Sequence, residues 1–198
     1  MRKSKARRKG TVLDRLKAEE AQDVLRRLLE AHPDLRAEAE EIARSLLREV
    51  HFEAVADEVE EAMGSFDIED LNGRAGRHEW GYVEPTEAAW EIIEEAVAPF
   101  VEDMNRQIEL GLEPEALEIC KGVVLGLYRA EHGKKGELAE WAPDFPAEAA
   151  GDAVRPWSTG DLLGETPPRR GLAFPPKFVE RFVPEWRDMI GRLVSRRR

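Results

Sequence analysis

Apolar residues recur at steps of three and four along almost the whole chain, from Leu13 to Leu193, and they rarely alternate with polar residues at steps of two. Because an α-helix turns once every 3.6 residues, that spacing places the apolar side chains on one face of each successive helix. The pattern predicts an all-α fold whose helices bury their apolar faces against one another. Short connections favour antiparallel helical hairpins, packed as an irregular bundle or a short α-solenoid-like array.

The first two predicted helices, residues 18–31 and 33–50, each carry a leucine-rich apolar face, and only His32-Pro33-Asp34 interrupts the pattern between them. Proline suits the first turn of a helix because the N–H that it lacks would have no partner there. So short a connection predicts that these two helices form an antiparallel hairpin. Residues 52–64 predict a third helix, which divides into an apolar face and an acidic face.

The helical pattern is interrupted after Asp67. Residues 67–71 are interpreted as a short turn and residues 72–83 as a loop, since the latter show no apolar period and contain three glycines. A long helix is predicted over residues 84–108, with either a kink or two tightly abutted helices at Pro99. The next helix, over residues 113–128, is apolar on nearly every side, which predicts a central position. Gly122 and Gly126 would let a neighbouring backbone approach this helix closely.

The C-terminal third alternates between helix and irregular chain. A turn at residues 132–136 and a short helix over residues 146–154 precede a stretch rich in proline and glycine. A final helix over residues 177–194, kinked at Pro184, is expected to pack on the body, because its large apolar face would otherwise promote aggregation. The predicted organisation is a basic, disordered arm (1–17), a helical domain (18–155), an irregular connector (156–176), and a C-terminal helix with a basic tail (177–198).

Charge is strongly segregated along the chain. The net charge is −11 overall, but residues 1–17 carry +7, residues 18–164 carry −23 and residues 165–198 carry +5. Basic ends on an acidic body are one arrangement that attracts nucleic acid or anionic lipid. Arg outnumbers Lys 22 to 8, which is typical of a GC-rich bacterial genome. The chain has one cysteine, and it shows no secretory signal and no apolar run long enough to span a membrane. These features favour a cytoplasmic location.

The loop predicted over residues 72–83 is the first candidate binding site. It combines guanidinium groups, an imidazole and two aromatic rings with glycines that let a ligand come near the backbone, and its candidate residues are Arg74, Arg77, His78, Trp80 and Tyr82. Guanidinium groups bind phosphate or carboxylate, and aromatic rings offer stacking faces. The alternative interpretation is that the aromatic rings anchor the loop on the helical body.

Signatures of catalysis and of metal or cofactor binding are not found. The four histidines show no metal-binding spacing, and the chain has no nucleophile elbow, phosphate-binding loop or dinucleotide fingerprint. Cys120 lies among apolar neighbours in a helix, an environment that keeps a thiol neutral. We therefore expect no cofactor and no metal, and no motif in the sequence supports an enzymatic function.

The favoured hypothesis is a non-catalytic protein–protein interaction or scaffolding module, with the candidate loop and neighbouring helix faces as the contact area. A second hypothesis is a nucleic-acid-associated protein whose basic termini bind phosphates through Arg2, Lys3, Lys5, Arg7, Arg8, Lys9, Arg196, Arg197 and Arg198. A third is an enzyme or binder for an anionic small molecule at Arg74, Arg77 and His78.

Overall fold

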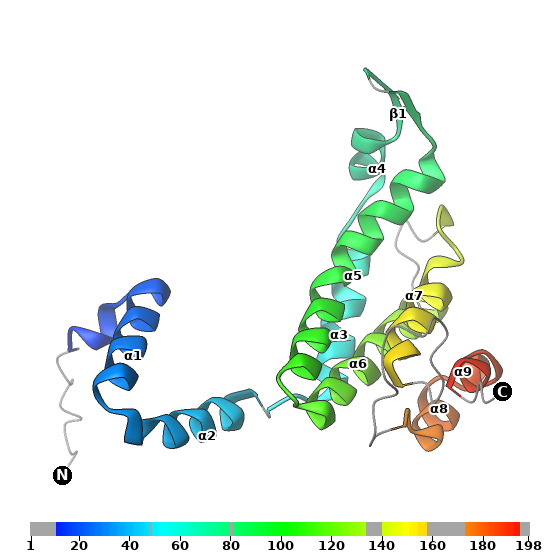
Figure 1. The fold of residues 1–198 in the computed structure, drawn as a ribbon. Coiled ribbons are helices and arrows are strands. Elements are labelled where there is room, and N and C mark those ends of the chain that lie inside the picture. Colours follow the sequence, from blue (N-terminus) through cyan, green and yellow to red (C-terminus); the bar gives the residue numbers. More distant parts are fainter. Residues whose placement is uncertain (1–10, 48, 80, 134–139, 158–172, 195–198) are drawn as a thin grey trace, which may run out of the picture. The chain divides into compact units, whose positions relative to one another are not determined.

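The computed structural model describes residues 11–47, 49–79, 81–133, 140–157 and 173–194, and helices account for most of them (Figure 1). The all-α class predicted from the apolar spacing is confirmed. The chain divides into two compact units, Met1–Arg48 and Glu49–Arg198, so the domain predicted over residues 18–155 spans this division. Each unit is described here by itself.

The N-terminal unit contains two helices that leave their apolar faces open. Its elements are η1 (Leu13–Arg15), α1 (Ala18–Ala31), η2 (Pro33–Leu35) and α2 (Arg36–Leu47). At the start of α1, the backbone N–H of Lys17 donates a hydrogen bond to the side-chain carboxylate of Glu20 at 2.9 Å. None of the described residues 11–47 is buried, and Leu25 of α1 and Leu46 of α2 are 49 % and 73 % exposed.

The antiparallel hairpin predicted for these two helices is not formed. Within the described residues of this unit, α1 and α2 both contact η2 but do not pack along each other (Figure 1). The physical reason is the turn beginning at Pro33, which redirects the chain without bringing the two apolar faces together.

The C-terminal unit is built around α6 (Glu113–His132), which packs against α3 (Phe52–Gly64) and α5 (Pro85–Glu109). Most residues of α6 between Ala116 and Leu127 are buried, which agrees with the central position predicted for this helix. Its two glycines lie against α3: a Cβ atom on Gly126 would come within 2.6 Å of the Cβ of Val59, and one on Gly122 would clash with Val55. These glycines allow the close helix approach that their spacing predicted.

The remaining helical elements cover this core. They are α4 (Ile68–Arg74), α7 (Phe145–Val154), η4 (Arg155–Trp157), α8 (Pro176–Phe182), η5 (Pro184–Trp186) and α9 (Arg187–Val194). The single helix predicted over residues 177–194 is thus divided at Val183, because Pro184 has no N–H to continue it. Phe178 of α8 packs edge-to-face on Phe52 of α3, with ring centroids 5.4 Å apart.

Residues 67–83 differ most from the sequence-based prediction. The expected turn is helix α4, where Asp67 accepts hydrogen bonds from the backbone N–H groups of Glu69 and Asp70 at 2.8 and 3.2 Å. The expected loop is an antiparallel hairpin of β1 (Gly76–His78) and β2 (Gly81–Val83), in which Arg77 pairs with Tyr82. Strands of three residues are too short to show an alternating pattern, so periodicity could not reveal them.

Candidate functional site

Arg74, the first predicted binding residue, already has a partner in the protein. Its guanidinium donates two hydrogen bonds to the carboxylate of Glu95 on α5, from Nη1 to Oε1 at 2.8 Å and from Nη2 to Oε2 at 2.5 Å. The hydrogen bond from Arg74 lowers the pKa of Glu95, and the same bond raises the pKa of Arg74. This two-point ion pair ties α4 to α5, so Arg74 acts as a structural link.

His78 also faces the body of the protein. Its Nε2 lies 2.7 Å from the backbone carbonyl oxygen of Arg74, and the side chain is half-buried. This contact holds the end of β1 against the end of α4. Trp80 lies outside the described residues.

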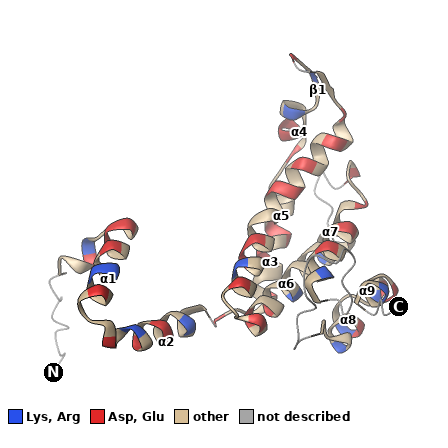
Figure 2. Ribbon diagram, in the orientation of Figure 1, with Lys and Arg blue, Asp and Glu red and all other residues tan. Residues whose placement is uncertain are grey.

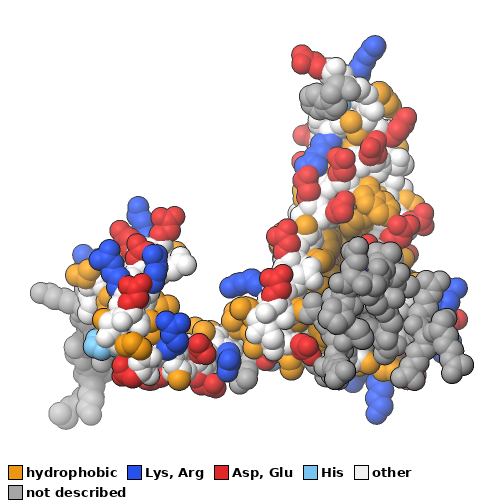
Figure 3. Space-filling model, in the orientation of Figure 1, with side chains coloured by type: hydrophobic (Ala, Val, Ile, Leu, Met, Phe, Trp, Pro, Cys, Tyr) orange, Lys and Arg blue, Asp and Glu red, His pale blue; other side chains and the backbone are white. Residues whose placement is uncertain are grey.

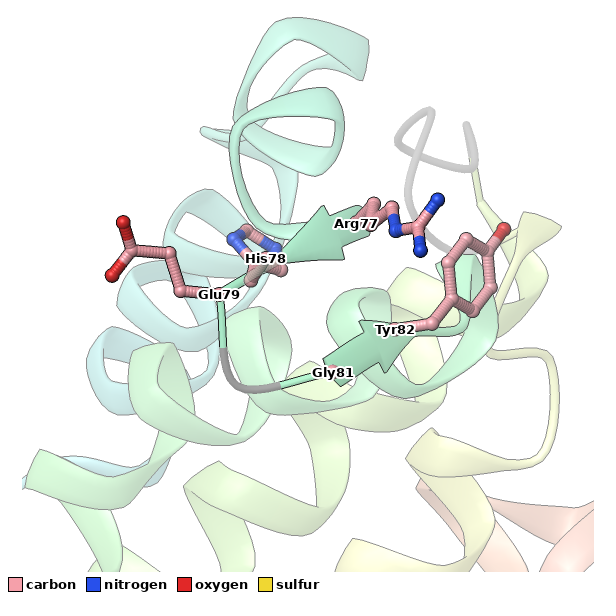
Figure 4. Close-up of a pocket in the computed structure, with 5 residues that line it drawn as sticks. All are labelled: Arg77, His78, Glu79, Gly81 and Tyr82. Carbon is pink, nitrogen blue, oxygen red and sulfur yellow. The ribbon is translucent and has the colours of Figure 1, made fainter.

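Arg77 and Tyr82 are the predicted site residues that the hairpin presents to solvent. They are cross-strand partners, Tyr82 is 61 % exposed, and both side chains point to the same side of the hairpin (Figure 4). With His78, Glu79 and Gly81 they line an open recess. One cation beside one phenol ring can contact an anionic or planar group. His78 lines the same recess, whereas Arg74 is not part of its lining and pairs with Glu95.

The predicted polyanion-binding residues, Arg2, Lys3, Lys5, Arg7, Arg8, Lys9, Arg196, Arg197 and Arg198, all lie outside the described residues. Most of the predicted connector, residues 158–172, lies outside them as well. No described helix is long and apolar enough to cross a membrane.

Cys120 is a structural residue of the core. Its side chain is fully buried and its Sγ donates to the backbone carbonyl oxygen of Ala153 at 3.2 Å. Burial raises the pKa of the thiol far above its ordinary value, so the nucleophilic thiolate does not form at neutral pH.

A second recess, between α5 and α7, was not found by sequence reasoning. It has a volume of about 290 Å³ and an apolar floor formed by Trp90, Val97, Ala98, Val101, Phe145, Ala149 and Ala153. Trp90 is half-buried and meets Phe145 edge-to-face, with ring centroids 5.0 Å apart. We call this recess the α5/α7 groove. Figure 3 shows hydrophobic side chains gathered beside α5 with acidic side chains near them.

Carboxylates from both helices border the α5/α7 groove: Glu94 and Glu102 on α5, and Glu148 and Asp152 on α7. Asp152 pairs with Arg155 one turn along the chain. Within the described part of the chain, no lysine or arginine pairs with the other three. The groove is therefore apolar at its floor and negatively charged along both sides.

The position of Trp90 could have indicated this groove. Trp90, Glu94, Val97 and Val101 follow one another at steps of four, three and four, which places them on one face of α5. That face overlaps the stripe that α5 buries in the core, since Val97 belongs to both. The spacing of residues could not reveal the opposite wall of the groove, because Phe145 lies 55 positions after Trp90 in the sequence.

Comparison of this chain with models of protein families, with characterised proteins and with solved structures finds no match. Fold and site geometry are therefore the grounds for the functional conclusion.

Proposed function

We propose that this chain is a non-catalytic protein-interaction module that binds a helical segment of another protein in the α5/α7 groove. The observation that carries the proposal is the half-buried Trp90 at the floor of an apolar recess between two helices. Tryptophan is enriched among the residues that dominate binding energy, and apolar grooves between helices are a recurring docking site for amphipathic helices.

The dimensions of the groove support a helical ligand. Its lining on α5 extends from Trp90 to Glu102, which corresponds to about 18 Å at the rise of an α-helix. About three turns of a bound helix fit along that length. Such a ligand would place apolar side chains at positions i, i+3 or i+4, and i+7 on the groove floor, as amphipathic helices do in other hydrophobic grooves.

The small-molecule hypothesis at the hairpin has weaker support. Glu95 occupies the guanidinium of Arg74, and the ring of His78 is turned toward the end of α4. The recess at the hairpin, to which Arg77, His78 and Tyr82 all contribute, is open, whereas small-molecule sites are enclosed and bury most of their ligand. The nucleic-acid hypothesis depends on the basic termini and stays a prediction.

A peptide selection tests the proposed function. The protein is screened against a displayed library of helix-forming peptides with apolar residues at i, i+4 and i+7, and the affinity of the selected peptides is measured by fluorescence anisotropy. We expect Ala98→Gln, which places a longer polar side chain on the groove floor, to weaken binding at least tenfold. Ala54→Gln, at an exposed position of α3, is the matched control and should bind as the wild type does.

Circular dichroism and thermal unfolding verify that both variants are folded. A selection that yields no helical binder contradicts the proposed function. Binders that tolerate Ala98→Gln as well as Ala54→Gln contradict it too, because they would attach elsewhere on the protein.

A further inference from the structure

Most carboxylates at the sides of the α5/α7 groove have no basic partner in the part of the chain that the structure describes. Glu94, Glu102 and Glu148 have no lysine or arginine partner within the described residues, and only Asp152 is paired, with Arg155. The wider surroundings are acidic as well. Helix α5 carries seven acidic residues and one basic residue, although Glu95 pairs with Arg74 and Asp103 with Arg106, and α7 carries two acidic residues and no basic one (Figure 2).

From this arrangement we infer that the α5/α7 groove selects a basic amphipathic helix, with lysine or arginine on both flanks of its apolar face. The inference rests on the proposed function and specifies the partner of the same site. The carboxylates stand on both walls, since Glu94 and Glu102 come from α5 and Glu148 and Asp152 from α7. A helix whose apolar face contacts the floor would therefore direct the residues flanking that face toward acidic side chains on both sides.

The carboxylates and the apolar floor contribute differently to recognition. Burial of apolar side chains against Trp90, Phe145 and Val101 supplies most of the attraction, because it removes apolar surface from water. The exposed carboxylates act mainly on the choice of partner and on the rate of association, and they exclude acidic helices by repulsion. Their effect should decline as salt screens the charges.

The preference for basic helices is tested with the library of helix-forming peptides described above. Lysine and glutamate are offered in equal proportion at the positions flanking the apolar face. We expect selection to enrich lysine over glutamate at least tenfold at these positions. The enriched peptide, remade with glutamate in place of each selected lysine, should bind at least tenfold more weakly at low ionic strength. That difference should shrink as salt is added.

Substitutions on the protein assign the effect to the groove. Glu94→Gln combined with Glu148→Gln should reduce the affinity for the lysine-rich peptide about tenfold and flatten its salt dependence. The control combines Glu53→Gln with Glu61→Gln, two exposed positions of α3, and changes the net charge equally. We expect the control to bind as the wild type does, because its charges do not border the groove.

Three outcomes would overturn the inference. Selected peptides that bind in the groove but carry as much glutamate as lysine would refute the charge preference and leave the proposed function standing. Equal loss in the groove variant and the α3 control would show that net charge alone attracts the peptide. Light scattering that detects a dimer of the wild type, dissociated by Ala98→Gln, would identify a second copy of this chain as the occupant.

Discussion

Gly126 of α6 and Val59 of α3 lie so close together that a Cβ atom on the glycine would come within 2.6 Å of the valine Cβ. The backbone carbonyl oxygen of Ala56 lies 2.8 Å from the same point. The contact therefore involves the α3 backbone itself, which cannot move aside as the end of a flexible side chain can. One turn away, Gly122 meets Val55 in the same manner, and the two glycines set how closely α3 and α6 pack.

Gly126→Ala should destabilise the C-terminal unit by about 1–3 kcal/mol, because the added methyl group forces two packed helices apart. The free energy of unfolding from urea titration measures this loss. Gly64→Ala, at the end of α3 where a Cβ atom would meet nothing within 4 Å, is the control and should not destabilise the unit. Equal stability of the Gly126→Ala variant and the wild type would contradict the prediction, because the cost of separating the helices would then not exceed the gain of about 1 kcal/mol from alanine's higher helix propensity.

Phe178→Ala should destabilise the C-terminal unit by about 3–5 kcal/mol, the range for removal of a buried aromatic ring. Phe178 is 6 % exposed and packs on the rings of Phe52, Phe174 and Phe182. Leu28→Ala in α1 should change the free energy of unfolding by less than about 0.5 kcal/mol, since Leu28 is 44 % exposed. Similar effects of the two substitutions in thermal and urea unfolding would contradict this contrast.

The carboxyl group of Glu95 should titrate below its ordinary range, because the hydrogen bond from Arg74 favours the charged form. Side-chain carbon chemical shifts followed by NMR against pH measure this pKa. Arg74→Gln should return the pKa to the range of an exposed glutamate. Because folding lowers this pKa, the stabilisation is present above the pKa of the unfolded chain and is lost as the pH falls through the lower, folded value.

Glu95→Gln should therefore make the free energy of unfolding less dependent on pH in this acidic window. Near neutral pH, the slope of the free energy of unfolding against pH should be the same in the variant and in the wild type. A pKa of Glu95 that is the same in the wild type and in the Arg74→Gln variant would exclude the ion pair in solution.

Cys120 should react with a thiol reagent such as DTNB at least about a hundredfold more slowly in the native protein than in the unfolded chain, because exposing a core residue requires local or global unfolding. The side chain is fully buried, and burial raises the pKa of its thiol. Absorbance of the released thiolate follows the reaction, with the protein in guanidinium chloride as the reference. Rapid reaction of the native protein would show that α6 is accessible at this position.

The sequence alone determined the all-α class, the central position of α6 and the close approach at Gly122 and Gly126. These features depend on local spacing, since a helix that is apolar on every side must be surrounded and two glycines one turn apart leave a flat surface. Other local signals were present but misinterpreted. Asp67 and Asp70 form reciprocal hydrogen bonds at the start of α4, whereas the pattern of residues 67–71 predicts a turn.

Only the tertiary structure decided which side chains face one another. Glu95 removes Arg74 from the predicted binding site, and it lies 21 positions away in the sequence. Trp90 and Phe145 form the floor of the α5/α7 groove from two helices, with α6 between them in the chain. The apolar faces of α1 and α2 follow the spacing of a helical hairpin, and yet none of their residues is buried. Periodicity specifies the face of each helix that is apolar, whereas the packing of distant segments specifies what covers that face.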